Sequence, residues 1–149
     1  MTTVEPAVTT PRRHAMKPRP GPVARRFGYV VAASLNAVVL YLVNGRPGWD
    51  AVPFLTHDTT LVLDAVNASI VVGIVANLVY VVADPRRLRA VGDAVTTAVG
   101  LYAMVRIWQV FPFDTGDGWT TVLRVLLAVG LVGSVIGIVS ALVRLVTGR

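Results

Sequence analysis

Three of the four apolar stretches in this chain share one length. Phe27–Gly45, Ala65–Ala83 and Val125–Val143 each run for 19 residues without an aspartate, glutamate, lysine or arginine. At about 1.5 Å of rise per residue, a helix of that length is roughly 28 Å long, which is close to the thickness of the hydrocarbon core of a bilayer. Each stretch therefore predicts a helix that crosses a membrane.

The remaining apolar stretch, third in chain order, is interrupted by charge. Only 12 uncharged residues separate Asp93 from Arg106, whereas a span needs about 20. A third helix must therefore hold an ionisable residue below the membrane surface. With 54% apolar and 15% charged residues, the chain is not an ordinary soluble domain, and its four apolar stretches predict an all-α fold. We expect an antiparallel four-helix transmembrane bundle with spans at about 24–45, 60–83, 89–111 and 119–146.

The distribution of basic residues predicts the orientation. Residues 1–22 hold five prolines and no apolar period, which predicts a disordered basic tail before a transmembrane domain at 23–149. The connection after the second span, Arg86–Arg89, is also basic, whereas the other two connections are mostly acidic. By the positive-inside rule both termini are cytoplasmic, and we expect an inner or plasma membrane location. The first span is expected to be retained, because no small-x-small cleavage site follows it.

Prolines, aspartates and tryptophans predict where the helices end. Pro85 and Pro112 are expected to stop the second and third helices, since the residue before proline disfavours the helical conformation. Asp58 is a candidate N-cap of the second helix, and Asp117 is placed to help cap the fourth. Three tryptophans fall near the non-cytoplasmic face, where their rings favour the interface: Trp49, Trp108 and Trp119.

Small residues on two helices predict close helix packing. The fourth helix carries two overlapping series of small residues: Gly133, Gly137 and Ala141, and Gly130 with Ser134. Such stripes allow backbones to approach within lipid, either inside the bundle or in a homo-oligomer. On the third helix a stripe shares one face with Arg106, which predicts that this arginine faces protein: Gly92, Thr96, Val99 and Ala103.

Polar residues inside the spans form a candidate intramembrane cluster. Asp64, Arg106 and Arg124 each lie about one and a half turns below the outer surface, and Asn67 lies one turn deeper than Asp64. A buried arginine costs at least about 2.5–3.5 kcal/mol without a partner, so we expect an Asp64–Arg106 ion pair. Arg124 either completes a triad or turns to the headgroups. The alternatives for Arg106 are snorkelling to the interface and a functional anion or proton site.

Several kinds of chemistry are not expected. The chain has no cysteine, and His14 and His57 are too far apart for metal-ligand spacing. No cofactor motif is present, and the serines within the spans have no general base near them in sequence. The positive charge follows the ends of the spans, which argues against nucleic acid as a partner. We therefore expect neither an enzyme nor a metal or cofactor protein.

Short segments of the chain resemble a known group. The stretch RIWQVFPFD from Arg106 to Asp114, with NLVY at 77–80 and Asp84-Pro85 before it, is similar to small four-span integral membrane proteins of high-GC bacteria that have no assigned activity. The similarity covers roughly residues 24–147. It implies a membrane location and supplies no catalytic residues.

The resulting expectation is a non-enzymatic integral membrane protein, structural or accessory to a larger assembly. Its partners are the bilayer, anionic lipid at the basic tail, and a second copy or another membrane protein. The alternative is a small channel or transporter that uses Asp64 and Arg106. The two differ in whether flux across a bilayer depends on Arg106.

Overall fold

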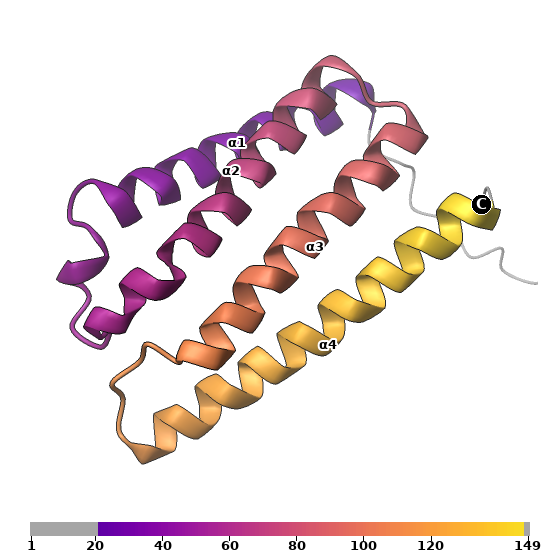
Figure 1. Cartoon of the computed structure of the whole chain (residues 1–149). Coiled ribbons are helices and arrows are strands. Elements are labelled where there is room, and N and C mark those ends of the chain that lie inside the picture. The colour runs from indigo at the N-terminus through magenta and orange to yellow at the C-terminus, as the bar shows by residue number, and fades with distance from the viewer. Residues whose placement is uncertain (1–20, 148–149) are drawn as a thin grey trace, which may run out of the picture.

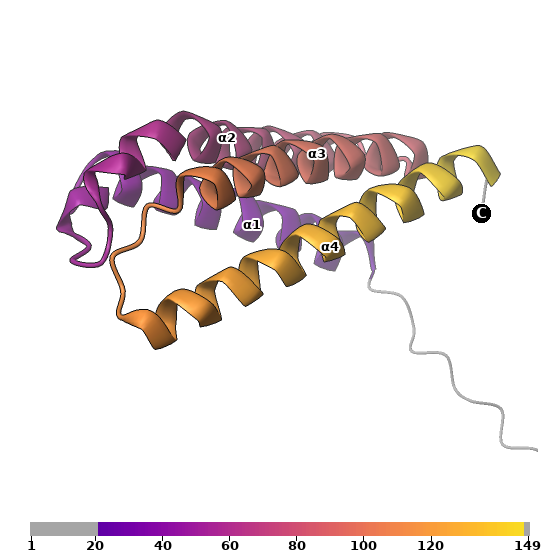
Figure 2. The same ribbon diagram turned by 60° about the horizontal axis from the view of Figure 1, so that its bottom comes forward.

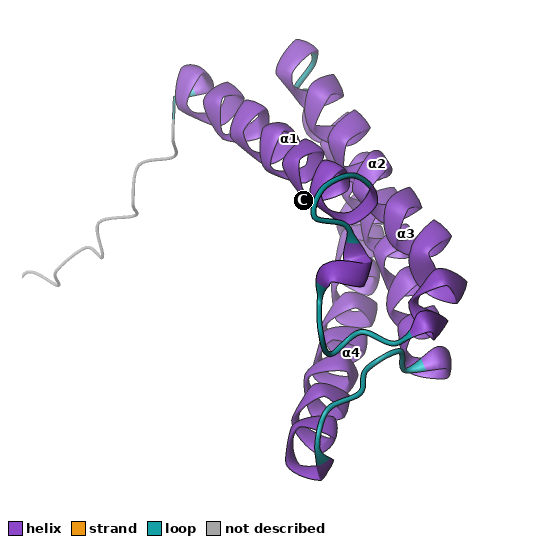
Figure 3. Cartoon of the chain, turned by 90° about the vertical axis from the view of Figure 1, so that its left-hand side faces the viewer, coloured by secondary structure: helices purple, strands orange, loops and turns teal. Residues whose placement is uncertain are grey.

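The structure, a computed structural model, describes residues 21–147, and these form four long helices joined by short connections (Figure 1). The long helices are α1 (Pro22–Asn44), α2 (Thr60–Val82), α3 (Arg86–Val110) and α4 (Asp117–Thr147), with short 3-10 helices η1 (Trp49–Ala51) and η2 (His57–Thr59) between α1 and α2. The described part of the chain contains no β-strand (Figure 3). The all-α class is confirmed, and every helix boundary lies within three residues of its predicted position. The predicted tail falls on residues 1–20, outside the described residues.

Prolines follow the ends of α2 and α3, as predicted. α2 stops at Val82, just before Pro85, and the extended backbone of Pro85 leads directly into α3. α3 stops at Val110, just before Pro112. Between them Phe111 takes a left-handed conformation, with φ at 45°, which turns the chain away from the helix axis.

The start of α2 differs from the prediction. Asp58 is not its N-cap, because α2 begins at Thr60 with Thr59 in the N-cap position, and Asp58 lies within η2. The tighter 3-10 turn of η2 precedes the helix, and the Thr60 hydroxyl donates to the carbonyl of His57 at 2.9 Å. Asp117 lies in the first turn of α4, where a carboxylate complements the positive end of the helix dipole.

The four long helices form an open row and not a closed bundle. Consecutive helices run antiparallel, with α1 packed on α2, α2 on α3 and α3 on α4 (Figure 1). Among the described residues, no other pair of long helices packs closely along its length. Figure 2 shows α4 crossing the other helices at a clear angle. The predicted four-helix bundle therefore needs this correction: α1 and α4 are the free edges of the row.

Two connections share one end of the row, which we call the double-loop end. There the α1–α2 and α3–α4 connections meet in an isolated antiparallel bridge between Leu55 and Phe113. The backbone N–H of Thr56 donates to Pro112 at 3.0 Å, and that of Asp114 donates to Phe54 at 2.9 Å. These bonds tie the α1–α2 connection to the α3–α4 connection. The opposite end carries the α2–α3 connection and its arginines, and we call it the arginine end.

Very little of the apolar surface is buried between the helices. Among the described residues, the buried apolar side chains are Ala33, Val62, Ala65, Tyr80 and Ala103. Large apolar side chains are exposed on all four helices, with Val82 at 83% and Val129 at 65%. Each long helix is long and apolar enough to cross a membrane. Helices that are apolar all round and exposed require an apolar surrounding.

Candidate functional site

The most connected polar group of the described chain lies at the arginine end, on Asp84. This residue follows α2 in the short α2–α3 connection, and its side chain is 13% exposed. Its Oδ2 lies 3.0 Å from Nε of Arg25 on α1, and its Oδ1 lies 3.4 Å from Nε of Arg89 on α3. The hydroxyl of Tyr29 donates to Oδ1 at 3.2 Å. One carboxylate thus joins three helices.

A second layer of this network lies deeper, around Tyr80. The Tyr80 hydroxyl donates toward Oδ1 of Asp93 at 3.0 Å and lies 3.1 Å from the carbonyl of Arg89. Its ring meets that of Tyr29 edge to face, with centroids 5.4 Å apart. Tyr80 is 5% exposed. Gly92 makes this approach feasible, since a Cβ at that position would lie within contact of the Tyr80 hydroxyl.

We call these residues the Asp84 cluster: Arg25, Tyr29, Tyr80, Asp84, Arg89 and Asp93. Two arginines and two aspartates balance one another, so the partly buried charges are compensated. No other acidic residue lies at this end of the described chain. The geometry indicates a structural tie between α1, α2 and α3.

Sequence reasoning did not find the Asp84 cluster. From the sequence, Asp84-Pro85 indicates only the end of a helix, and the basic residues Arg86–Arg89 indicate only the orientation. One signal was available: Asp84 and Asp93 are the acidic residues among the arginines at this end. Isolated carboxylates in a basic region usually have arginine partners.

The predicted ion pair between Asp64 and Arg106 is absent from the described residues. Arg106 Nη2 instead donates to the backbone carbonyl of Leu61 on α2 at 3.2 Å. Leu61 lies about one helical turn nearer the double-loop end than Asp64, about 4.5 Å along the axis. The long arginine side chain therefore extends past the carboxylate toward the end of the helix. Asp64 itself is exposed.

The face of α3 that carries Arg106 does contact protein, as the small-residue stripe predicts. Ala103 is 5% exposed, Gly92 lies against Tyr80 of α2, and Arg106 bonds to α2. Thr96 and Thr97 each bond to the carbonyl of Asp93 in their own helix. The stripe thus packs α3 on α2, while the Thr96 hydroxyl bonds within its own helix.

The other two members of the predicted polar cluster lie in separate places. Asn67 exchanges amide hydrogen bonds with Asn44 of α1, at 2.8 and 2.7 Å. The guanidinium of Arg124 stacks over the Phe111 ring, 4.7 Å from its centroid, in cation–π geometry. The four residues Asp64, Asn67, Arg106 and Arg124 therefore do not form one site.

The small residues of α4 differ in how closely α3 approaches them. A Cβ on Gly130 would lie 3.2 Å from Sδ of Met104 on α3, and one on Gly137 would lie 3.8 Å from Cγ2 of Thr97. A Cβ on Gly133 would meet no atom within 4 Å. Ser134 and Ala141 are half-buried. Part of the stripe therefore packs on α3, while the Cβ position of Gly133, about 60° round the helix from Gly130, is open.

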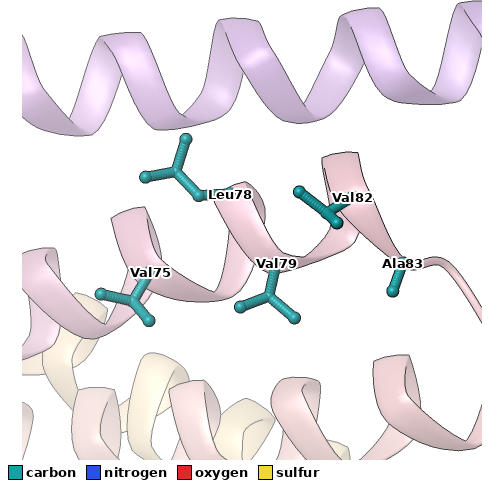
Figure 4. Close-up of a pocket in the computed structure, with 5 residues that line it drawn as sticks. All are labelled: Val75, Leu78, Val79, Val82 and Ala83. Atoms are coloured by element: carbon teal, nitrogen blue, oxygen red, sulfur yellow. The ribbon is translucent and has the colours of Figure 1, made fainter.

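An open apolar groove follows the second half of α2 (Figure 4). It has a volume of about 400 Å³ and is lined by Val75, Leu78, Val79, Val82 and Ala83. These positions recur at helical spacing and form one stripe of α2. Nothing polar lines the groove, which is unsuited to catalysis. Among the residues described, no group of histidine, aspartate and glutamate could hold a metal ion.

Comparison with known proteins supplies no further assignment. No family model, curated protein or solved structure matches this chain. Function must therefore be argued from the helices and their contacts.

Proposed function

We propose that this chain is a non-enzymatic integral membrane protein, structural or accessory to a larger membrane assembly. It would cross an inner or plasma membrane four times, with both termini and the arginine end in the cytoplasm. The positive-inside rule favours that orientation, because exposed arginines gather at one end and aspartates at the other. The resemblance to small four-span proteins of high-GC bacteria agrees with this location.

One observation carries the proposal: the apolar side chains of four long helices face outward. A soluble protein of this composition would bury these side chains, whereas here only a few are buried. At about 25 cal/mol per Å² of apolar surface, leaving them in water would cost more than the folded state gains. Lipid provides the missing contact on every side of the row.

The open row supports an accessory role. α1 and α4 each pack on one neighbour along their length, so each has a free apolar side. Gly133 on α4 would allow a further helix to approach closely, because no described atom lies within 4 Å of its Cβ position. A second copy or another membrane protein could pack there, with lipid as the default neighbour.

The alternative, a small channel or transporter, has less support. Asp64 and Arg106 do not pair, and the side-chain amide of Asn67 is hydrogen-bonded to that of Asn44. The middle of the spans is mostly apolar. A conducting path would need polar groups at successive depths. Polar side chains inside the spans, such as Asn36, Ser69 and Ser134, are few and are separated by valine, alanine, isoleucine and leucine.

Extraction, topology mapping and a flux assay test the proposal. The protein should stay with membranes after alkaline carbonate washing and leave them only with detergent. Reporter fusions at the two termini should give the same side, and a fusion at Arg46 the opposite side. Liposomes containing the purified protein should show no ion flux above protein-free liposomes. Release without detergent, or termini on different sides, would overturn membrane residence or topology.

The variant Arg106→Leu separates the accessory function from transport. In the accessory protein it should leave fold and oligomeric state intact, because it removes one hydrogen bond to a backbone carbonyl and a cation that lipid disfavours. A flux that is present in the wild type and disappears in Arg106→Leu, with the fold retained, would establish the transporter instead.

A further inference from the structure

The groove on α2 has the dimensions of one lipid chain in one leaflet. From Val75 to Ala83 it extends about 12 Å along the helix, at about 1.5 Å per residue. Half of a hydrocarbon core of about 30 Å is about 15 Å. The groove is open along its length, and all of its lining residues come from α2, so an acyl chain could lie in it with one side facing the surrounding lipid. Figure 4 shows the lining side chains along α2, with α1 on one side and α3 on the other.

The groove ends where exposed arginines begin. Ala83 lines its end and is followed, after Asp84 and Pro85, by Arg86 and Arg87 at the start of α3. Three extended residues cover at most about 11 Å, so the first guanidinium is within reach of a headgroup above the groove.

The arginines at the arginine end differ in whether they form ion pairs. Arg25 and Arg89 are held by Asp84. Arg86 and Arg87 are exposed, and neither forms an ion pair within the described part of the chain. Asp84, the nearest carboxylate, is already bonded. Arg86 and Arg87 therefore present positive charge that no described carboxylate compensates.

We propose that this is a binding site for an anionic phospholipid of the cytoplasmic leaflet. One acyl chain lies along Val75, Leu78, Val79 and Val82, and the headgroup phosphate pairs with Arg86 and Arg87. Guanidinium groups match phosphate oxygens with paired hydrogen bonds. A net negative headgroup is favoured over a zwitterionic one, because the choline of the latter would meet the same two cations. The proposal rests on the proposed membrane residence.

Native mass spectrometry of the full chain in mild detergent tests the headgroup part. The protein is titrated with equal amounts of phosphatidylglycerol and phosphatidylcholine of identical chains. The wild type should retain phosphatidylglycerol preferentially. Arg86→Gln with Arg87→Gln should lower that preference roughly 10- to 30-fold, since each basic residue near an anionic surface contributes a factor of about five.

Two matched variants complete the charge test. Arg86→Lys with Arg87→Lys should keep most of the preference, because the charge remains. Arg46→Gln, an exposed arginine at the double-loop end, should behave as the wild type. The site would be overturned if the wild-type protein showed no preference for phosphatidylglycerol. It would also be overturned if the glutamine double variant showed the same preference as the wild type; that result would place anionic lipid binding elsewhere, such as the basic tail.

A second pair of variants tests the groove. Val75→Phe fills it, and Val139→Phe makes the same change on α4 at a residue of equal exposure, 54% for both. Val75→Phe should reduce retained phosphatidylglycerol several-fold, and Val139→Phe should not. Equal retention of phosphatidylglycerol in the two variants would show that the groove does not bind the acyl chain. Membrane residence is judged separately by carbonate extraction, so a failed lipid site and a failed membrane assignment give different results.

Discussion

Asp84 and Arg25 are 59 residues apart in the chain, yet Oδ2 of one lies 3.0 Å from Nε of the other. This contact joins the start of α1 to the end of α2. Arg89 reaches the same carboxylate from α3. The side chain of Asp84 thus links α1, α2 and α3 at the arginine end of the row.

Replacing Asp84 should loosen this end. Asp84→Asn keeps the shape of the side chain but leaves Arg25 and Arg89 near one another without a counter-charge. We expect a loss of about 1–3 kcal/mol in the free energy of unfolding, as for a partly buried charged hydrogen bond. Thermal unfolding in detergent, followed by circular dichroism, measures it. Asp114→Asn removes an exposed carboxylate at the other end and should change little; equal effects would contradict the structural role of Asp84.

Gly92 should not tolerate a side chain. In Gly92→Ala the new Cβ would collide with the Tyr80 hydroxyl and approach Cζ at 2.9 Å, so α2 and α3 must move apart. The expected cost is about 1–3 kcal/mol. Gly100→Ala is the control on the same helix, because its Cβ meets nothing within 4 Å. That change should stabilise α3 by about 0.5–1 kcal/mol. Equal shifts in unfolding temperature would refute the close approach.

The amide pair between α1 and α2 should show measurable coupling. Asn44 and Asn67 exchange hydrogen bonds in both directions. A double-mutant cycle with Asn44→Ala, Asn67→Ala and the double variant should give a coupling free energy of about 0.6–1.7 kcal/mol. The unfolding free energies of the four proteins supply it. Additive single effects would mean that the pair contributes nothing to helix association.

A large side chain should have different effects at Gly130 and at Gly133 of α4. Gly130→Leu places a side chain against Met104, where even a Cβ lies 3.2 Å from Sδ. We expect a loss of about 1–3 kcal/mol. Gly133→Leu should leave the unfolding free energy of the monomer nearly unchanged, because its Cβ position is open. Unfolding and light scattering in detergent distinguish the two, and dissociation of an oligomer by Gly133→Leu alone would identify that side as an interface.

The helices themselves were predictable because their signals are local. Span length and the prolines after α2 and α3 depend on neighbouring residues, and these gave boundaries within three residues of those observed. The face of α3 that carries Arg106 was also predictable, since helical phase places Gly92 and Ala103 beside it. The contacts between residues far apart in the sequence were not predictable in this way. Counting residues from the membrane surface could not tell the level of Asp64 from that of Leu61, one turn apart.

Helix packing that is mainly between consecutive helices has a consequence for how the molecule is made. Each helix meets its main partner as soon as the next hairpin has been synthesised, and α1 need not wait for α4. Contacts that are close in sequence require little loop-closure entropy and favour rapid assembly. The protein is therefore suited to stepwise insertion during translation, with α4 added last onto a three-helix unit already fastened at its arginine end.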